Sequence, residues 1–248
     1  MKTILDVKNL CKSFEDTHVL NNINFKVSEG EFIAIMGQSG SGKSTMLYNI
    51  SGMDRPTSGN VILNGQDISQ LDEEKLSSVR LNNMGFIFQH SYLLKNLSIR
   101  DNIVLPGFKS GKFTREQVNK NADELMVKTG IESVAAHDIK KVSGGQLQRT
   151  AICRALINHP DILFGDEPTG ALNSSTTNEV MDIINDINSA GTTVIVVTHD
   201  AKVAARASRV IFLMDGNINS ELALGKYDEE KKLSREKSLS DWLEKQGF

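Results

Sequence analysis

Residues 37–44 read Gly-Gln-Ser-Gly-Ser-Gly-Lys-Ser and match the phosphate-loop pattern G-x-x-x-x-G-K-[ST]. This pattern joins a buried strand to a helix, and its glycines let backbone N–H groups curl around a polyphosphate. The flanks fit, because 31–36 (EFIAIM) is a short apolar run and 45–50 continues as an amphipathic helix. A Gly/Ser linker would explain neither flank. The pattern therefore predicts a site for a nucleoside triphosphate with Mg²⁺.

Each part of this loop has an expected role. Lys43 supplies positive charge to the β- and γ-phosphates, Ser44 offers a hydroxyl to Mg²⁺, and the helix start adds its positive dipole end. The candidate nucleotide-binding residues of the loop are Gly37, Gln38, Ser39, Gly40, Ser41, Gly42, Lys43, Ser44 and Thr45.

Composition narrows the class of protein. The 248 residues, 39% of them hydrophobic, suffice for one large α/β domain or two small ones. A net charge of −3 disfavours nucleic acid as a partner. Apolar runs fall short of the roughly 20 residues of a membrane span, and the N-terminus lacks a signal-peptide core, so we expect a soluble chain in the cytosol. Cys11 and Cys153 are expected to be small buried hydrophobes.

The N-terminal part predicts antiparallel strands. Residues 3–14 and 19–27 alternate polar and apolar side chains, and 56–69 adds a strand and an Asn64-Gly65 turn. Phe14, taken alone, is more easily read as a core aromatic. An aromatic residue near a nucleotide site could instead stack on the base.

Residues 93–142 have a helical texture that interrupts the α/β pattern. Thr114 and Gln117 form a capping box, and Gly130 ends a predicted helix over 114–129. Residues 72–82 predict an exposed, charged helix. Serine and two glycines at 143–145 then open a helix that stops before Pro160, which predicts a second anion-binding helix start. A simple nucleotide kinase needs only one.

Three predicted buried strands end in polar residues. The strand 84–88 delivers Gln89, the strand 161–167 ends in Asp166 and Glu167, and the strand 192–197 leads to His199. We expect Asp166 to hold Mg²⁺ and Glu167 to deprotonate the attacking water, although charged strand ends at a surface are common. His199 could contact the γ-phosphate, and a structural role is the alternative. From Lys226 onward we expect a charged, helical, solvated tail, with docking to a partner as the weaker alternative.

The order and spacing of these motifs resemble those of ATP-binding cassette (ABC) ATPases over about residues 3–220. The resemblance implies an α/β fold of the P-loop NTPase type. This fold has a RecA-like mixed sheet, an antiparallel β subdomain and an inserted α-helical subdomain at about 93–155. It also implies one domain over 1–248, with a C-terminal appendage at about 221–248.

The same resemblance assigns roles to the motifs. Phe14 would stack on adenine, and Gln89 would couple the nucleotide to a membrane partner. The signature Ser143, Gly144, Gly145 and Gln146 would contact the γ-phosphate held by a second copy, so that two ATP molecules lie in a head-to-tail homodimer. The implied catalytic residues are Glu167, His199 and Gln89, and the implied Mg²⁺ ligands are Ser44, Gln89 and Asp166.

Residues 56–59, 102–106 and 168–173 are similar to the macrolide-export and lipoprotein-release branch, and within it to bacitracin and lantibiotic resistance ATPases. That likeness implies an ATPase bound to the inner face of the membrane by a permease with about ten helices and a large extracellular domain, often beside a sensor histidine kinase. A cell-division or lipoprotein-release ATPase that signals through a related permease is the alternative. A soluble ABC protein acting on DNA or ribosomes would carry a coiled coil or a second cassette.

Two positions depart from the family pattern. Val142 replaces a leucine before the signature serine, which is a conservative apolar change. Asn173 replaces an aspartate in the loop after the acidic strand, which puts coupling between the two ATP sites in doubt.

Overall fold

The computed structural model describes residues 2–248, which form two compact units. The first contains the residues up to Leu76 and Ile187–Phe248, and the second is Ser77–Asp186. Helices α2 (Glu73–Asn83) and α6 (Ser174–Ser189) carry the chain across the two boundaries. No helix of residues 2–248 has the length and hydropathy that a membrane span requires.

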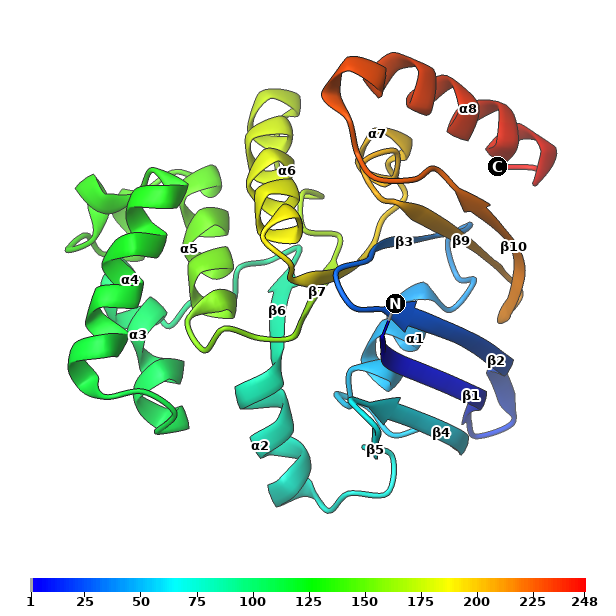
Figure 1. Cartoon of the computed structure of the whole chain (residues 1–248), viewed down its shortest axis with the longest axis horizontal. Coiled ribbons are helices and arrows are strands. Elements are labelled where there is room, and N and C mark those ends of the chain that lie inside the picture. The colour runs from blue at the N-terminus through cyan, green and yellow to red at the C-terminus, as the bar shows by residue number, and fades with distance from the viewer. Residues whose placement is uncertain (1) are drawn as a thin grey trace. The chain divides into compact units, whose positions relative to one another are not determined.

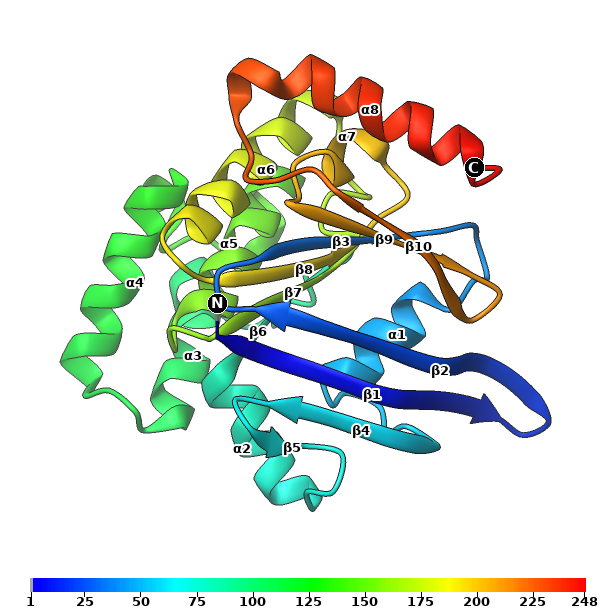
Figure 2. The same cartoon turned by 45° about the vertical axis from the view of Figure 1, so that its right-hand side comes forward.

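The first unit contains an antiparallel sheet in the order β2-β1-β4-β5, and Figure 2 shows β2, β1 and β4 running side by side across the view. The strands are β1 (Thr3–Phe14), β2 (Thr17–Ser28), β4 (Ser58–Leu63) and β5 (Gln66–Asp67). Asn64 and Gly65 join the last two with φ angles of 49° and 83°, the left-handed pair that a tight hairpin turn requires. The predicted antiparallel patch is confirmed.

The same unit contains a mixed sheet built around β3 (Phe32–Met36), whose residues are all buried. β3 pairs in parallel with β8 (Thr193–Val197) and β9 (Arg209–Met214), and β9 pairs antiparallel with β10 (Asn217–Ala223). Because Ile35 lies opposite Val197, the segments after β3 and β8 leave the sheet at one edge. These segments lead into α1 (Lys43–Ile50) and α7 (Ala201–Ala204).

The C-terminal helix α8 (Lys232–Lys245) packs on this unit beside β10, as Figure 1 shows, after the 3₁₀ turn Glu229–Lys231. Its buried face carries Arg235, Leu239 and Leu243, and the Trp242 ring lies 6.1 Å from that of Phe212. The expectation of a solvated tail is therefore wrong. Charged residues dominate the composition of the helix, but all of them except Arg235 are exposed or half-buried.

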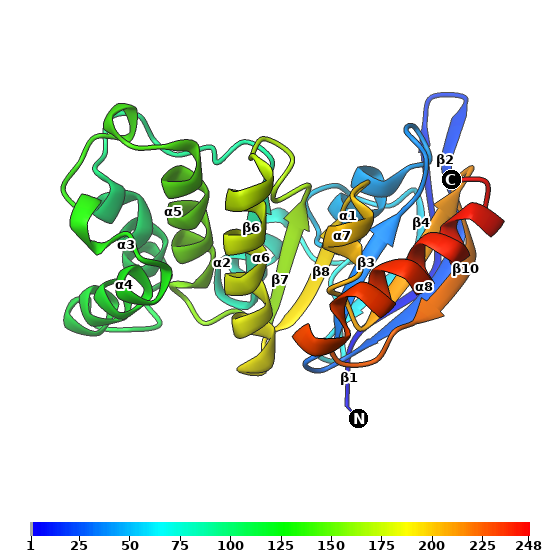
Figure 3. The same cartoon turned by 90° about the horizontal axis from the view of Figure 1, so that it is seen from above.

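The second unit has two parallel strands, β6 (Met84–Phe88) and β7 (Ile162–Asp166), and a helical part that Figure 3 shows as neighbouring helices. These helices are α3 (Ile99–Ser110), α4 (Arg115–Thr129) and α5 (Gly144–Leu156), with 3₁₀ turns at Glu132–Val134 and Ile139–Lys141. Apolar side chains from all three helices form one buried cluster. The capping box and the Gly130 stop of α4 are both present, as predicted.

Candidate functional site

The phosphate loop lies between β3 and α1, as the sequence predicts. Gly37 has a φ of 153°, and a Cβ built on it would lie 2.1 Å from the carbonyl oxygen of Leu213. Gly42 precedes α1 in the left-handed conformation, with a φ of 99°. Both conformations strongly favour glycine. The loop geometry is thus the one in which backbone N–H groups can approach a phosphate without a side chain between them.

The residues of the phosphate loop differ in how far they are exposed to solvent. Lys43 folds back over the loop, and its ammonium group donates hydrogen bonds to the carbonyl oxygens of Gly37 (2.9 Å) and Gln38 (2.7 Å). Gln38, Ser39, Gly40 and Ser44 are exposed, Thr45 is half-buried, and Ser41 is buried. Because the lysine side chain is flexible, its ammonium group can leave the loop carbonyl oxygens and bind a phosphate instead.

Phe14 lies at the end of β1, and its side chain is 51% exposed. The alternative of a core aromatic is therefore wrong. The Lys12 ammonium lies 4.6 Å from the centre of the ring, and Asp54 holds that ammonium through a 2.8 Å ion pair. Phe14 thus presents an exposed aromatic ring that is supported by a buried cation.

His199 follows β8 at the same sheet edge as the phosphate loop and is exposed. Its neighbours are fixed locally: Thr198 Oγ1 accepts a hydrogen bond from the Asp200 N–H, and the Asp200 carboxylate caps α7. Asp200 therefore has a structural role in this segment, where it begins α7.

In the second unit, Gln89 and Glu167 follow the two paired strands β6 and β7. Phe88 lies opposite Asp166 in the register, so the next residue on each strand leaves the sheet at the same edge. A Cβ built on Gly170 would lie 3.1 Å from both Gln89 Nε2 and Glu167 Oε2. The structure thus brings together three of the predicted catalytic and metal-binding residues, Gln89, Asp166 and Glu167.

The backbone of Glu167 has a φ of 47°, in the left-handed region that costs energy for a residue with a side chain. Such strain in a non-glycine residue is concentrated at functional sites. Here it falls on the carboxylate predicted to be the general base.

Ser143 and Gln146 form a capping box at the start of α5. Ser143 Oγ accepts from the Gln146 N–H at 3.3 Å, and Gln146 Oε1 accepts from the Ser143 N–H at 2.8 Å. Gly144 and Gly145 form the first turn of the helix. Asn173, the departure from the family pattern, caps α6 by accepting a hydrogen bond from the Thr176 N–H.

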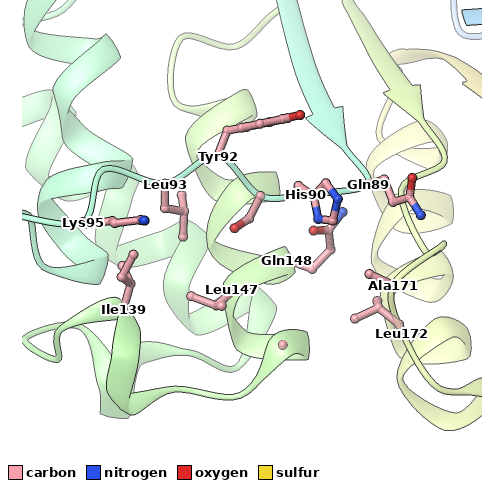
Figure 4. A pocket seen from close by; sticks show the side chains of 12 residues that line it. Gln89, His90, Tyr92, Leu93, Lys95, Ile139, Leu147, Gln148, Ala171 and Leu172 are labelled. Carbon is pink, nitrogen blue, oxygen red and sulfur yellow. The ribbon is translucent and has the colours of Figure 1, made fainter.

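A pocket of about 300 Å³ opens beside the start of α5, as Figure 4 shows. Its walls are residues of 89–95, of the first turns of α5 and of 171–172, with Ile139 on one side. Tyr92, at its rim, is 67% exposed. Predictions from sequence missed both this pocket and the buried Gln148 in its wall, because its surface is assembled from separate segments.

A family model described as ABC transporter matches residues 20–170. The macrolide export ATP-binding/permease protein MacB of Campylobacter fetus is 43% identical over 222 residues, or 88% of this chain and 34% of that protein. MacB of Hyphomonas neptunium is 40% identical over the same shares of the two chains. The chain thus spans about a third of the length of the curated relatives it matches.

Two groups of solved structures share the fold. The ATP-binding cassette MJ0796, solved as a dimer in a post-hydrolysis state with ADP and Pi, superposes with a TM-score of 0.82 at 38% identity and covers 90% of this chain and 100% of its own. CbiO1 of Clostridium perfringens, part of the ABC transporter complex cbiONQ, has a TM-score of 0.83 at 27% identity over 96% of this chain and 93% of its own. The chain therefore belongs to the ABC transporter family and is one of its ATPase cassettes.

Proposed function

We propose that this cassette is the subunit of a membrane transporter that binds ATP with Mg²⁺ and hydrolyses it, and that residues 1–248 act as one domain. The observation that carries the proposal is the placement of Gln89 and Glu167 after adjacent strand ends, where Gln89 Nε2 and Glu167 Oε2 both approach Gly170. Within an ABC cassette, a carboxylate and an amide in this position can orient a water molecule for attack on a phosphate.

The first unit would bind the nucleotide. Lys43 leaves the loop carbonyls to bind the β- and γ-phosphates, while the exposed ring of Phe14 stacks on adenine. The exposed residues Gln38, Ser39 and Gly40 offer backbone N–H groups to the phosphates, and His199 contacts the γ-phosphate. Ser44, Gln89 and Asp166 are the oxygen donors proposed for Mg²⁺, which neutralises charge on the phosphates.

Glu167 would accept the proton of the attacking water. Its exchange for glutamine keeps the shape of the side chain but removes the base, so Glu167→Gln should lower kcat by roughly two orders of magnitude. ATP binding should persist, because the phosphate loop is intact. Full ATPase activity in this variant, measured by phosphate release, would remove Glu167 from the role of general base.

The signature residues Ser143–Gln146 would complete the site of a second copy. Supporting this, MJ0796 has been solved as a dimer, and Ser143 and Gln146 begin α5 at an exposed helix start. Glu167→Gln should therefore accumulate as an ATP-dependent homodimer in light scattering. A monomer at saturating ATP would contradict the two-site arrangement.

The pocket beside α5 would receive a short cytoplasmic helix of the permease. It is concave, it carries the apolar side chains Leu93 and Leu147, and Tyr92 and Leu94 stay exposed near it. Docking there would hold the cassette on the inner face of the cell membrane. Tyr92→Asp should weaken co-purification with the permease and leave the ATPase activity of the isolated cassette unchanged.

The cargo proposed is an antimicrobial peptide of the bacitracin or lantibiotic type. Support comes from the similarity to MacB proteins and from the residues 168–173 and 102–106. Tagged cassette should then co-purify with one permease of about ten membrane helices and a large extracellular domain, with a sensor histidine kinase in some preparations. A small four-helix permease would favour instead a cell-division or lipoprotein-release ATPase that signals through its partner.

A further inference from the structure

Gln148 lies in the second turn of α5 with only 3% of its surface exposed. Its amide nitrogen donates one hydrogen bond to the carbonyl oxygen of Phe88 at 3.0 Å and another to that of Pro168 at 2.6 Å. A primary amide has two N–H groups, so both donors of this side chain are used. Figure 4 shows the side chain directed toward the segment that carries Gln89.

The two carbonyl groups adjoin the residues of the proposed reaction. Phe88 immediately precedes Gln89, and Pro168 immediately follows Glu167. The peptide group directly before Gln89 and the peptide group one residue beyond Glu167, between Pro168 and Thr169, are therefore tied to one amide group. Glu167 has a strained φ of 47°, and an unfavourable backbone conformation persists only where its surroundings hold it.

A second side chain of α5 holds the same segment. Arg154 donates to the carbonyl oxygens of Ser91 (2.7 Å) and Tyr92 (2.8 Å). Helix α5 thus fixes three carbonyl groups of residues 88–92. Gln148 also reaches the segment after β7, through its hydrogen bond to the carbonyl oxygen of Pro168.

We propose that Gln148 is a positioning residue for ATP hydrolysis, which sets the spacing of Gln89 and Glu167 through the backbone carbonyls of Phe88 and Pro168. This proposal rests on the proposed function. It assigns Gln148 no contact with ATP, water or metal. Loss of its two donors lets the peptide groups of Phe88 and Pro168 turn, and the Gln89 amide and the Glu167 carboxylate then no longer converge at Gly170.

Two substitutions at position 148 distinguish the effect of the amide donors from the effect of the side chain's volume. Gln148→Met keeps the length and volume of the side chain but removes both donors. Gln148→Glu is isosteric, but its carboxylate would face two carbonyl oxygens. We expect kcat to fall at least about tenfold in both variants, with the dissociation constant for ATP within about twofold of the wild-type value, because the nucleotide contacts lie on the phosphate loop.

The pH profile adds a readout that a purely structural residue would not change. A buried carboxylate among carbonyl oxygens is protonated more readily than usual, and the protonated acid can donate one hydrogen bond. The kcat of Gln148→Glu relative to that of the wild type should therefore rise as the pH falls, and that of Gln148→Met should not. Gln70→Met and Gln70→Glu, at an exposed position, are the matched controls and should behave as the wild type.

The outcomes are distinct. If the wild-type chain hydrolyses ATP and both folded Gln148 variants keep kcat within about twofold, the positioning role is overturned. If Gln148→Met does not fold in a thermal melt, the pH profile of Gln148→Glu decides, and a profile parallel to that of the wild type overturns the proposal. A wild-type chain without ATPase activity would overturn the proposed function itself, and this inference with it.

Discussion

The ammonium group of Lys12 lies 4.6 Å from the ring centre of Phe14 and is held there by Asp54 and by the carbonyl oxygen of Arg55. Lys12 is 9% exposed, whereas Phe14 is 51% exposed. The ring is thus fixed from one side, and its accessible surface faces solvent. The Asp54 side chain is 36% exposed, so the ion pair holds the buried ammonium group while its carboxylate keeps contact with solvent.

Phe14→Ala should raise the KM for ATP by roughly fivefold to a hundredfold, since stacking of a base on an aromatic side chain contributes about 1–3 kcal/mol. The kcat should stay close to that of the wild type, because the reacting groups are unchanged. Phe14→Tyr should restore the wild-type KM. A thermal melt provides the control: an exposed ring should cost little stability, and a loss of about 3–5 kcal/mol would return Phe14 to the core.

Gly170→Ala should impair hydrolysis and spare nucleotide binding. The new methyl group would lie 3.1 Å from both Gln89 Nε2 and Glu167 Oε2, which is closer than ordinary van der Waals contact. Each of the two side chains must move away from the new methyl group by a few tenths of an ångström, and misplaced catalytic groups lose up to roughly a hundredfold in rate. Stopped assays of phosphate release and ATP titrations measure the two effects separately. Equal kcat in wild type and Gly170→Ala would show that this spacing is not critical.

Arg235→Met should destabilise the first unit by roughly 2–4 kcal/mol, because several buried carbonyl groups lose a charged donor at once. Arg235 is 6% exposed. Its guanidinium donates to the carbonyl oxygens of Ala205, Ala207, Leu224, Gly225 and Lys226.

Urea denaturation measures this loss. Lys237→Met, at an exposed position on the same helix, is the control and should change stability by less than about 0.5 kcal/mol. If the two variants unfold at the same urea concentration, the hydrogen bonds of Arg235 do not contribute to the stability of the unit.

The elements of the fold were predictable where local signals agree. The phosphate loop, the Asn64-Gly65 hairpin and helix α4 each combine a hydrophobic period with a specific turn or capping residue. The packing of α8 on the first unit was not predicted, because charged side chains on its outer face lower the mean hydropathy of the helix. Leu239 and Leu243, four residues apart, were the available sign of a buried face.

The candidate site likewise contains residues that the sequence points to and residues that only the structure reveals. The residues Gln89, Asp166 and Glu167 were proposed from sequence, because each lies at or directly after the end of a short apolar strand. Gln148 and Lys12 were not, because each acts on segments that the fold brings near: Gln148 is 60 residues from Phe88, and Lys12 is 42 residues from Asp54. A polar residue on a helix gives no sign of such distant partners.

Cys153 should be inert to thiol reagents in the folded protein. The side chain is buried in the apolar cluster of α3, α4 and α5, beside the Thr129 hydroxyl at 3.1 Å. Burial raises the pKa of the Cys153 thiol from 9.0 to about 12, so the reactive thiolate is scarce at about pH 8. Ellman's reagent should label Cys153 only after unfolding. The assay uses the Cys11→Ser variant, because Cys11 is only half-buried and its own reaction with the reagent would obscure that of Cys153.

The same pKa shift predicts how stability depends on pH. The thiol is neutral in the folded chain up to about pH 12, whereas in the unfolded chain it loses its proton near pH 9.0. Its contribution to stability is therefore complete below pH 9.0 and is lost as the pH rises from there toward 12. The stability difference between the wild type and Cys153→Ala should shrink over that range. A difference that stays constant from neutral pH upward would mean that the thiol ionises equally in both states, and hence that it is not buried.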